Sequence, residues 1–281
     1  MKSNFRVYPG SVAGKSATGR KGVKMVKGLF TSWTGMANEQ KRLDVITNNL
    51  ANAATTGYKK DGVTNQSFRN LLAYKVKDVS ENYTDKQIGK MSLGVKIGEV
   101  YTNYDQGSLR STGNTFDFAI QGKGFFNVST TDKDGNQVVK YTRDGSFTMN
   151  QDGKLVDVNG NTLMGEGGEI TIPDNTANVK VDENGSIYAD GVFVDKIKLT
   201  DFTDYSYLKK QGDSFYLPQD GATQLDSTAT IQQGYTEQSN VNVVTEMTSM
   251  IAITRAYEAN QKVIQTIDGT LDLAANSVGK V

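Results

Sequence analysis

The residues of this chain that could carry out chemistry are few in kind. The sequence contains no histidine and no cysteine, which removes imidazole bases, thiol nucleophiles, disulfides and thiolate metal sites. Catalysis would therefore rest on carboxylates, lysine, serine or tyrosine. Asp117, Asp144 and Glu166 could supply the carboxylate pair of a glycoside hydrolase, which needs neither histidine nor cysteine. Their spacing singles out no pair, so we predict no catalytic residue.

Two glycine patterns resemble ligand-binding loops, but turns explain them better. Gly122-Lys123-Gly124 lacks the spacing of a phosphate-binding loop and precedes a predicted strand instead of a helix. Acidic segments that end in Asp-Gly or Asn-Gly echo part of a calcium loop, but the glutamate that would follow the glycine is missing. They lie at residues 132–135, 150–153, 157–160 and 182–185. We predict hairpin turns at all of them, with no metal and no cofactor.

Charge and hydropathy narrow the classes of partner. The chain has 281 residues, with 31 lysines and arginines and 31 aspartates and glutamates, so its formal net charge is zero. No overall field attracts nucleic acid or an anionic membrane surface, whereas a neutral surface permits self-association. No stretch approaches the roughly 18 to 20 apolar residues of a membrane span. We therefore expect no nucleic-acid partner and no membrane insertion.

The sequence predicts a helix near each end of the chain, and these helices would help to position any site. Leu29, Met36, Leu43 and Leu50 recur every seven residues, with Trp33 and Ile46 beside them. Near the other end, Val243, Met250, Tyr257, Ile264 and Leu271 recur with the same period, and Ile253 and Ile267 fill the intermediate positions. Such heptad stripes are typical of helices that pair as coiled coils. A solitary long helix cannot bury its own stripe, so each needs the other helix or a neighbouring copy.

Short alternating runs fill the middle of the chain. Segments such as VVKYT, KLVDV and SIYA read as strands of about four to eight residues separated by turns. The predicted fold is α+β: long terminal helices paired as a coiled coil, with a central all-β domain of short antiparallel strands. The predicted domains are a disordered basic extension, an N-terminal helix, a connector, a central β domain and a C-terminal helix, at residues 1–24, 25–58, 59–95, 96–235 and 236–281.

Four ordered motifs give the chain a family resemblance. The segment NNLANAATTGYKK at residues 48–60 closes a helical signature, and SNVNVV with RAYEAN, within residues 239–260, forms a second. Between them lie STGNTFDFAIQGKGFF and YTRDGSF, within residues 111–147. Together these motifs resemble the flagellar rod and hook proteins of bacteria over nearly all of residues 25–281. The SNVNVV and YTRDGSF forms favour the distal-rod type of subunit, with the proximal-rod type second.

The resemblance implies a structural, non-enzymatic role. It implies a subunit that polymerises helically through its terminal helices into the torque-transmitting drive shaft of the basal body, outside the cytoplasmic membrane. The implied partners are further copies of this chain, other flagellar rod and hook proteins, and the flagellar export apparatus. A proximal-rod or rod–hook junction subunit, an assembly cap and a carboxylate-based cell-wall hydrolase remain alternatives.

We expect the assembly interface to follow the two helical stripes and the asparagine-rich stretch. Asn48, Asn49 and Asn52 can satisfy the last helix carbonyls or bond to a neighbour, and Gly57 suits a left-handed turn. The predicted interface residues are Leu29, Trp33, Met36, Leu43, Ile46, Asn49, Leu50, Asn52, Gly57, Tyr58, Val243, Met247, Met250, Ile253, Tyr257, Asn260, Ile264, Ile267 and Leu271.

Overall fold

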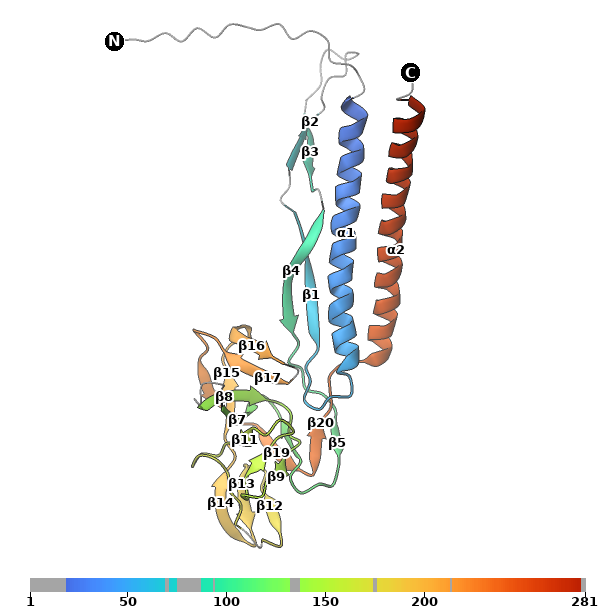
Figure 1. The fold of residues 1–281 in the computed structure, drawn as a ribbon. Helices are drawn as coiled ribbons and strands as arrows, with labels where there is room; N and C mark the ends of the chain where they lie inside the picture. The colour runs from blue at the N-terminus through green and yellow to red at the C-terminus, as the bar shows by residue number, and fades with distance from the viewer. Residues whose placement is uncertain are drawn as a thin grey trace, which may run out of the picture. The chain divides into compact units, whose positions relative to one another are not determined.

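The fold places two long helices at the ends of a strand-rich chain (Figure 1). A computed structural model describes residues 19–68, 71–74, 87–92, 94–131, 137–173, 176–212 and 214–278. Helix α1 spans Gly19–Ala51, and helix α2 spans Val243–Leu273 and continues as a π-helical turn at Ala274–Val278. The chain forms two compact units. Unit 1 comprises Met1–Gln40, Asn65–Ile97 and Thr254–Val281; unit 2 comprises Lys41–Thr64 and Gly98–Ile253.

Two-stranded ribbons follow α1. Strand β1 (Asp61–Ser67) pairs with β4 (Val95–Thr102), and β2 (Leu71–Tyr74) pairs with β3 (Gln87–Met91). In unit 1, α1 turns a polar face inward: Thr34 and Asn38 are buried. Asn38 Nδ2 donates to Asn65 Oδ1 at 3.2 Å, and the side chain of Thr34 abuts Gly94. This face of α1 is therefore held by polar contacts with the chain around β1 and β4.

The remaining strands lie in unit 2 and are antiparallel. A nine-stranded sheet has the order β16-β17-β8-β7-β11-β10-β9, and β15 joins it by pairing with β7 and β18. The order β12-β13-β14 forms a three-stranded sheet, while β6 pairs with β19 and β5 with β20. The strands are β5 Leu109–Ser111, β6 Phe118–Gln121, β7 Phe125–Thr131, β8 Gln137–Thr142, β9 Thr148–Met149, β10 Leu155–Val156, β11 Thr162–Leu163, β12 Val179–Val181, β13 Ser186–Ala189, β14 Val192–Lys196, β15 Leu199–Phe202, β16 Leu208–Gln211, β17 Phe215–Pro218, β18 Gln224–Asp226, β19 Thr230–Gln233 and β20 Tyr235–Glu237, with a 3₁₀ turn at Tyr205–Tyr207.

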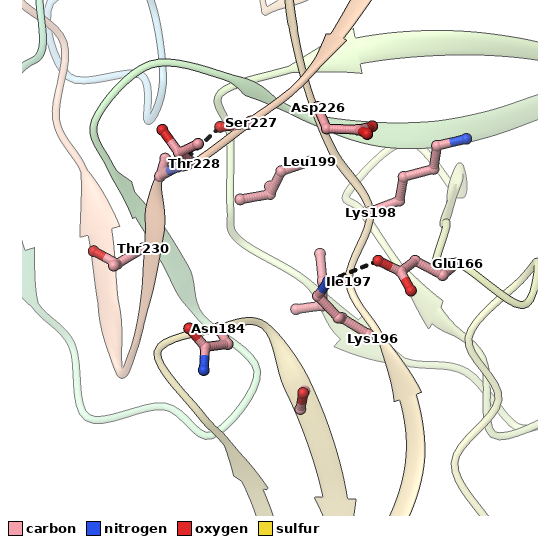
Figure 2. A pocket seen from close by; sticks show the side chains of 12 residues that line it. Glu166, Asn184, Lys196, Ile197, Lys198, Leu199, Asp226, Ser227, Thr228 and Thr230 are labelled. Carbon is pink, nitrogen blue, oxygen red and sulfur yellow. Dashed lines mark hydrogen bonds and ion pairs between the residues drawn. The ribbon is translucent and has the colours of Figure 1, made fainter.

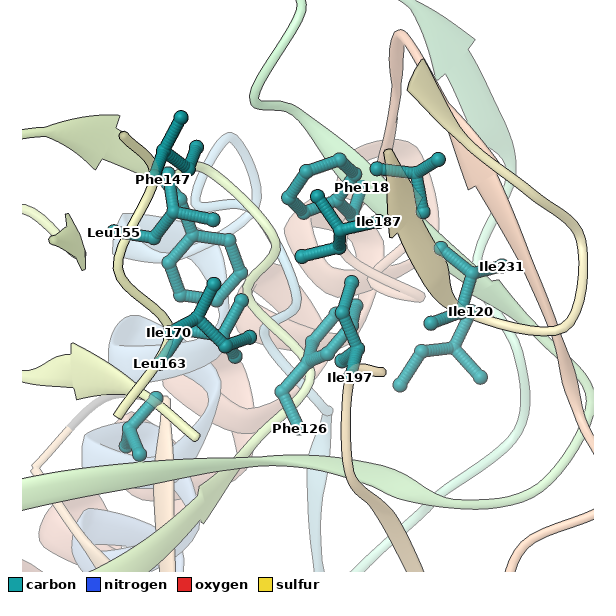
Figure 3. Close-up of a cluster of buried hydrophobic side chains, with 13 residues drawn as sticks. Phe118, Ile120, Phe126, Phe147, Leu155, Leu163, Ile170, Ile187, Ile197 and Ile231 are labelled. Carbon is teal, nitrogen blue, oxygen red and sulfur yellow. The ribbon is translucent and has the colours of Figure 1, made fainter. Parts of the chain in front are cut away.

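The core of unit 2 is aliphatic and aromatic (Figure 3). Phe118 and Ile120 from β6 pack with Phe126 from β7, and Ile187 and Ile197 meet them from the segments around β13 and β15. Strand β13 alternates half-buried and buried side chains, as expected of a strand with one face on the core. A second cluster is built around Phe125, Tyr141, Phe202, Leu208 and Tyr216. Burial of this kind supplies the main favourable term in folding.

The predicted turns are confirmed where the structure describes them. Gly153, Gly160 and Gly185 all adopt positive φ angles, of 76°, 81° and 84°. Each glycine N–H donates to the carbonyl three residues earlier, at 2.8 to 3.0 Å. The fourth predicted turn, at 132–135, lies outside the described residues. Glycine is required at these points because side-chain-bearing residues disfavour a positive φ angle.

The prediction of an α+β fold with coiled-coil helices is wrong. The described chain is mainly β, with two long α-helices at its ends. Of the predicted helical stripes, only Ile253 is buried, and Trp33, Val243 and Leu271 are exposed. Within unit 1 the part of α1 that approaches α2 presents glycine: a Cβ atom on Gly35 would lie 3.1 Å from Asn260 Nδ2. A coiled coil needs side-chain knobs at such positions, and glycine provides none.

Parts of the predicted domain map fall outside the described residues. The predicted basic extension lies mostly in residues 1–18, and α1 begins at Gly19. In the predicted connector, residues 69–70, 75–86 and 93 are likewise not described, while β1, β2 and β3 lie in the rest. In the described part of the chain, no helix has the length and apolar character needed to cross a membrane.

Candidate functional site

The asparagine-rich stretch NNLANAATTGYKK forms a turn that enters the interior of unit 2. Helix α1 ends at Ala51, and Asn52 donates from its backbone and its side chain to the carbonyl of Asn48, both at 3.1 Å. Gly57 is buried with a φ angle of 67°, and its N–H donates to the Glu237 carbonyl at 2.8 Å. A Cβ atom there would lie 2.5 Å from the carbonyl carbon of Arg143. Only glycine fits this close backbone contact.

Tyr58 connects the turn to the end of helix α1 by hydrogen bonds. Its ring is fully buried, and its hydroxyl is 2.8 Å from Asn48 Oδ1 and 3.2 Å from Asn49 Oδ1. Asn49 also pins the start of β1, since its Nδ2 donates to the Asp61 carbonyl at 2.8 Å and its Oδ1 accepts from the Asp61 N–H at 2.9 Å. These asparagines therefore fix both the end of α1 and the direction of the next strand.

A buried ion cluster lies beside this turn. Lys59 Nζ is 2.5 Å from Glu237 Oε1, and Arg143 Nη1 is 3.3 Å from Glu237 Oε2. Glu237 also accepts from the Gly107 N–H at 2.8 Å, and Lys59 donates to the Asp105 carbonyl at 2.8 Å. The side chains of Lys59 and Glu237 have no solvent exposure, and that of Arg143 has 4%. Such a cluster stabilises the fold only while every charge keeps its partner.

Burial governs the ionisation of Lys59. Desolvation lowers the pKa of the Lys59 ammonium, and the attraction of the Glu237 carboxylate and its hydrogen bond act in the opposite direction. Arg143 is held by a further bond from Nη2 to the Gly122 carbonyl at 2.8 Å. The loop of Gly122 and Gly124, which the sequence predicts as a turn, thus helps to fix a cation. It leads into strand β7 as expected, and the turn prediction is confirmed.

The second signature joins the same region. The backbone N–H of Lys60 donates to Asn240 Oδ1 at 2.8 Å, and Lys60 Nζ forms an ion pair with Glu246. Asn240 Nδ2 in turn donates to the Asn103 carbonyl at 2.9 Å. Asn242 caps α2, because its Oδ1 accepts from the Thr245 N–H at 3.1 Å. The start of α2 is therefore bound to the segment that follows α1.

Lys210 of strand β16 contacts both Tyr58 in the turn and Asp61 at the start of β1. Its Nζ lies 3.9 Å from the centroid of the Tyr58 ring and 2.9 Å from Asp61 Oδ2. Asp61 Oδ1 accepts from the Thr102 hydroxyl at 2.8 Å. The cation–π contact and the ion pair tie β16 to the beginning of β1. We call this group of contacts, centred on Tyr58, Lys59, Glu237 and Arg143, the motif junction.

The carboxylates considered for catalysis each have a structural partner. Asp117 accepts from Thr112 Oγ1 at 2.6 Å within its own loop. Asp144 accepts from Thr56 Oγ1 at 2.6 Å, and burial raises its pKa above the ordinary value. Glu166 pairs with Lys196 at 2.7 Å on the surface. Each carboxylate is engaged in a separate structural contact.

A cavity of about 700 Å³ lies elsewhere in unit 2 (Figure 2). The segments around Lys198 and Thr228 line it, and the Glu166–Lys196 ion pair lies at its side. Its lining combines hydroxyl groups and charges of both signs, without an aromatic surface.

The predicted interface residues fall into three groups. Asn49, Gly57 and Tyr58 are buried in the motif junction, and Ile253 is buried on α2. Trp33, Val243, Met247 and Leu271 are exposed. The others are half-buried: Leu29, Met36, Leu43, Ile46, Leu50, Asn52, Met250, Tyr257, Asn260, Ile264 and Ile267.

Sequence reasoning missed the ion cluster. Lys59 and Glu237 are 178 residues apart, and neither belongs to a stripe or a turn pattern. The available signal was the position of each residue in or near a motif. Lys59 directly follows Tyr58 in one motif, Arg143 lies within YTRDGSF, and Glu237 lies two residues before SNVNVV. Segments that resemble one family's motifs are candidates for mutual contact in the fold.

Motifs that are far apart in the sequence converge in unit 2. They meet at a buried, charge-paired contact that joins the segment after α1 and the segment before α2 to the strands. Three family profiles match: the flagella basal body rod protein at residues 29–59, the D1 domain of the flagellar hook protein FlgE/F/G at 119–189, and the C-terminal domain of the flagellar basal body rod FlgEFG proteins at 232–277.

Curated relatives agree over most of the chain. The flagellar basal-body rod protein FlgG of Buchnera aphidicola subsp. Schizaphis graminum is 35% identical, covering 88% of this chain and 98% of the relative. The hook-basal body complex protein FlhO of Bacillus subtilis is 33% identical, covering 92% and 100%. The rod protein FlgF of Caulobacter vibrioides is 34% identical, covering 92% and 98%.

The chain belongs to the flagellar basal-body rod protein family. It is a structural subunit of the rod and is located in the flagellar basal body, outside the cytoplasmic membrane. The chain is similar to FlgG and FlgF proteins at nearly the same identity, 35% and 34%.

Proposed function

We propose that this chain is a distal-rod-type subunit that polymerises helically through its terminal helices and transmits torque, without enzymatic activity. The observation that carries the proposal is the outward apolar surface of both helices. Phe30 and Trp33 on α1 are exposed, as are Val244, Met247 and Ile251 on α2. Clustered exposed apolar side chains mark interaction sites.

The motif junction suits a load-bearing subunit. It joins the segment after α1, the segment before α2 and the loop of Arg143 within unit 2. A force on either terminal segment therefore reaches the β unit through buried, charge-assisted bonds, which are stronger than neutral hydrogen bonds. In this proposal, stiffness comes from the junction inside each subunit and from many modest contacts between subunits.

The first test replaces an exposed residue, so that assembly and folding are separated. Ile251→Asp is expected to keep the circular-dichroism spectrum and thermal midpoint of the isolated chain, because the side chain is exposed. It is expected to abolish incorporation into basal bodies, because a buried intersubunit contact would leave the carboxylate unpaired. Ala252→Asp adds the same charge at a neighbouring exposed position, about 100° around the helix, and is expected to incorporate. Normal incorporation of Ile251→Asp would contradict the proposal.

Copy number tests the type of subunit. Quantitative mass spectrometry of purified hook-basal bodies would compare this chain with the hook protein. Many copies per basal body support the distal-rod type, and only a few support the proximal-rod or junction alternative. The proposed partners are further copies of this chain, other rod and hook proteins, and the flagellar export apparatus. Co-purification with those proteins from cells arrested during rod assembly would test them.

A further inference from the structure

An aromatic patch lies on the outward side of α1 in unit 1. Phe30 and Trp33 are 45% and 54% exposed, and their ring centroids are 6.2 Å apart. The ring of Phe68, which is half-buried, lies 6.2 Å from Phe30. Ring contacts restrict these side chains, so a partner would lose little side-chain entropy in binding them. Exposed tryptophan is enriched among the residues that dominate binding energy at interfaces.

An aliphatic patch lies on the first turns of α2, in unit 2. Val243, Val244, Met247 and Ile251 are 40%, 71%, 49% and 56% exposed. At about 100° per residue they fall within roughly a third of the helix circumference, so they form one continuous stripe. The other exposed apolar residues of α2, Val263, Leu271 and Leu273, lie about three turns or more beyond Ile251, so they are separate from this stripe.

We infer that the aromatic patch of one copy binds the aliphatic patch of the next copy, a heterologous contact that builds the filament. The inference rests on the proposed function, because it takes a second copy of this chain as the partner. The two patches differ in chemistry and lie on different helices and in different units. Pairing each patch with itself would close a dimer, whereas pairing one with the other leaves a free patch at each end and allows open growth.

The two surfaces complement each other. Met247 is flexible and polarisable, and thioethers make favourable contacts with aromatic rings. The outward face of α1 becomes polar after Trp33, at Lys41, Asp44 and Thr47. The outward face of α2 becomes polar after Ile251, with Arg255 and Glu258 exposed. A contact shifted toward Lys41 on α1 or toward Arg255 on α2 would place apolar side chains against charges.

Disulfide mapping tests the contact, because the native chain contains no cysteine. Trp33→Cys and Ile251→Cys chains with different epitope tags are produced together in cells lacking the native chain. Their basal bodies are purified and oxidised. A dimer carrying both tags is expected, while either variant alone stays monomeric. A second pair, Lys27→Cys with Thr248→Cys, flanks the patches at exposed positions and leaves every patch residue in place. Lys41→Cys with Ile251→Cys is the control and is expected to give no dimer.

The outcomes separate this inference from the proposed function. Disulfide dimers from either single variant alone would show an isologous contact and overturn the inference. Normal incorporation into rods without a mixed dimer from either pair would overturn the inference and leave the proposed polymer intact. Absence of the native chain from purified rods would overturn both. If Trp33→Cys fails to incorporate, the flanking pair decides by the same criteria.

Discussion

Glu237→Gln should destabilise unit 2 strongly, because the substitution keeps the shape of the side chain and removes its charge. Lys59 would lose a fully buried counter-ion at 2.5 Å, and Arg143 would face an amide. Removing one partner of a buried ion pair costs about 3 to 5 kcal/mol, since the remaining charge is desolvated without compensation. With a urea m-value of about 3 kcal/mol/M, the unfolding midpoint falls by roughly 1 to 1.7 M.

The assay can follow each unit separately. Near-ultraviolet circular dichroism reports the tyrosine cluster of unit 2, and fluorescence of Trp33, the only tryptophan, reports unit 1. Glu166→Gln makes the same chemical change at an ion pair whose side chains are 42% and 60% exposed. That control should cost less than about 1 kcal/mol, as surface pairs do.

A double-mutant cycle isolates the pair. Lys59→Met alone leaves Glu237 with Arg143 and is expected to cost less than Glu237→Gln. The double variant should be less destabilised than the sum of the two single variants, because it removes both members of the closest pair. If Glu237→Gln shifted the midpoint no more than Glu166→Gln, the cluster would not hold unit 2 together, and our reasoning on the junction would fail.

Three further substitutions test parts of the junction. Gly57→Ala should cost about 3 kcal/mol or more in urea unfolding, because it combines a left-handed backbone with overlap against Arg143; a cost below about 1 kcal/mol would contradict the close contact. Tyr58→Phe should cost about 1 kcal/mol by the same assay, through loss of the bond to Asn48; an unchanged midpoint would show that this bond adds nothing. Burial raises the pKa of Asp144, so its contribution to stability is present below the ordinary carboxyl pKa and is lost as pH rises through the raised one. Relative to the native chain, Asp144→Asn should therefore gain stability as pH rises from about 4 to 7, and parallel unfolding profiles would refute this.

Short sequence patterns correctly predicted the turns and the two helices, because both depend on residues that are close together in the sequence. Hairpin turns follow from Asp-Gly and Asn-Gly pairs because the glycine must adopt a positive φ angle, as Gly153 and Gly185 do. The helical prediction for the chain ends holds because heptad periodicity is a local property. The two helices do approach each other in unit 1, but the coiled-coil prediction placed the wrong residue at the contact: Gly35, one residue before the stripe residue Met36, lies beside Asn260. Periodicity alone does not say which neighbouring position faces a partner.

At the motif junction, Gly57 likewise has one property that the sequence predicts and one that it does not. Its left-handed conformation was predictable from the residue type, but its reason was not. We expected it to end the helix, whereas α1 ends at Ala51 and Gly57 instead lets the chain pass against the backbone of Arg143. That contact joins residues far apart in the sequence. A single sequence carries no record of which distant backbone segment will lie there.

The contacts inside the subunit differ in polarity from the proposed contacts between subunits. Inside unit 2, the terminal segments are joined by buried charges with fixed partners, such as Lys59 with Glu237. An apolar contact could slip by a turn at little cost, whereas moving Lys59 away from Glu237 would leave two buried charges without compensation. The proposed contacts between subunits are apolar and exposed in the single chain, as at Trp33 and Ile251. A rod built this way can add subunits reversibly during growth while each subunit keeps one internal register, because repacking the exposed patches costs far less than breaking the junction.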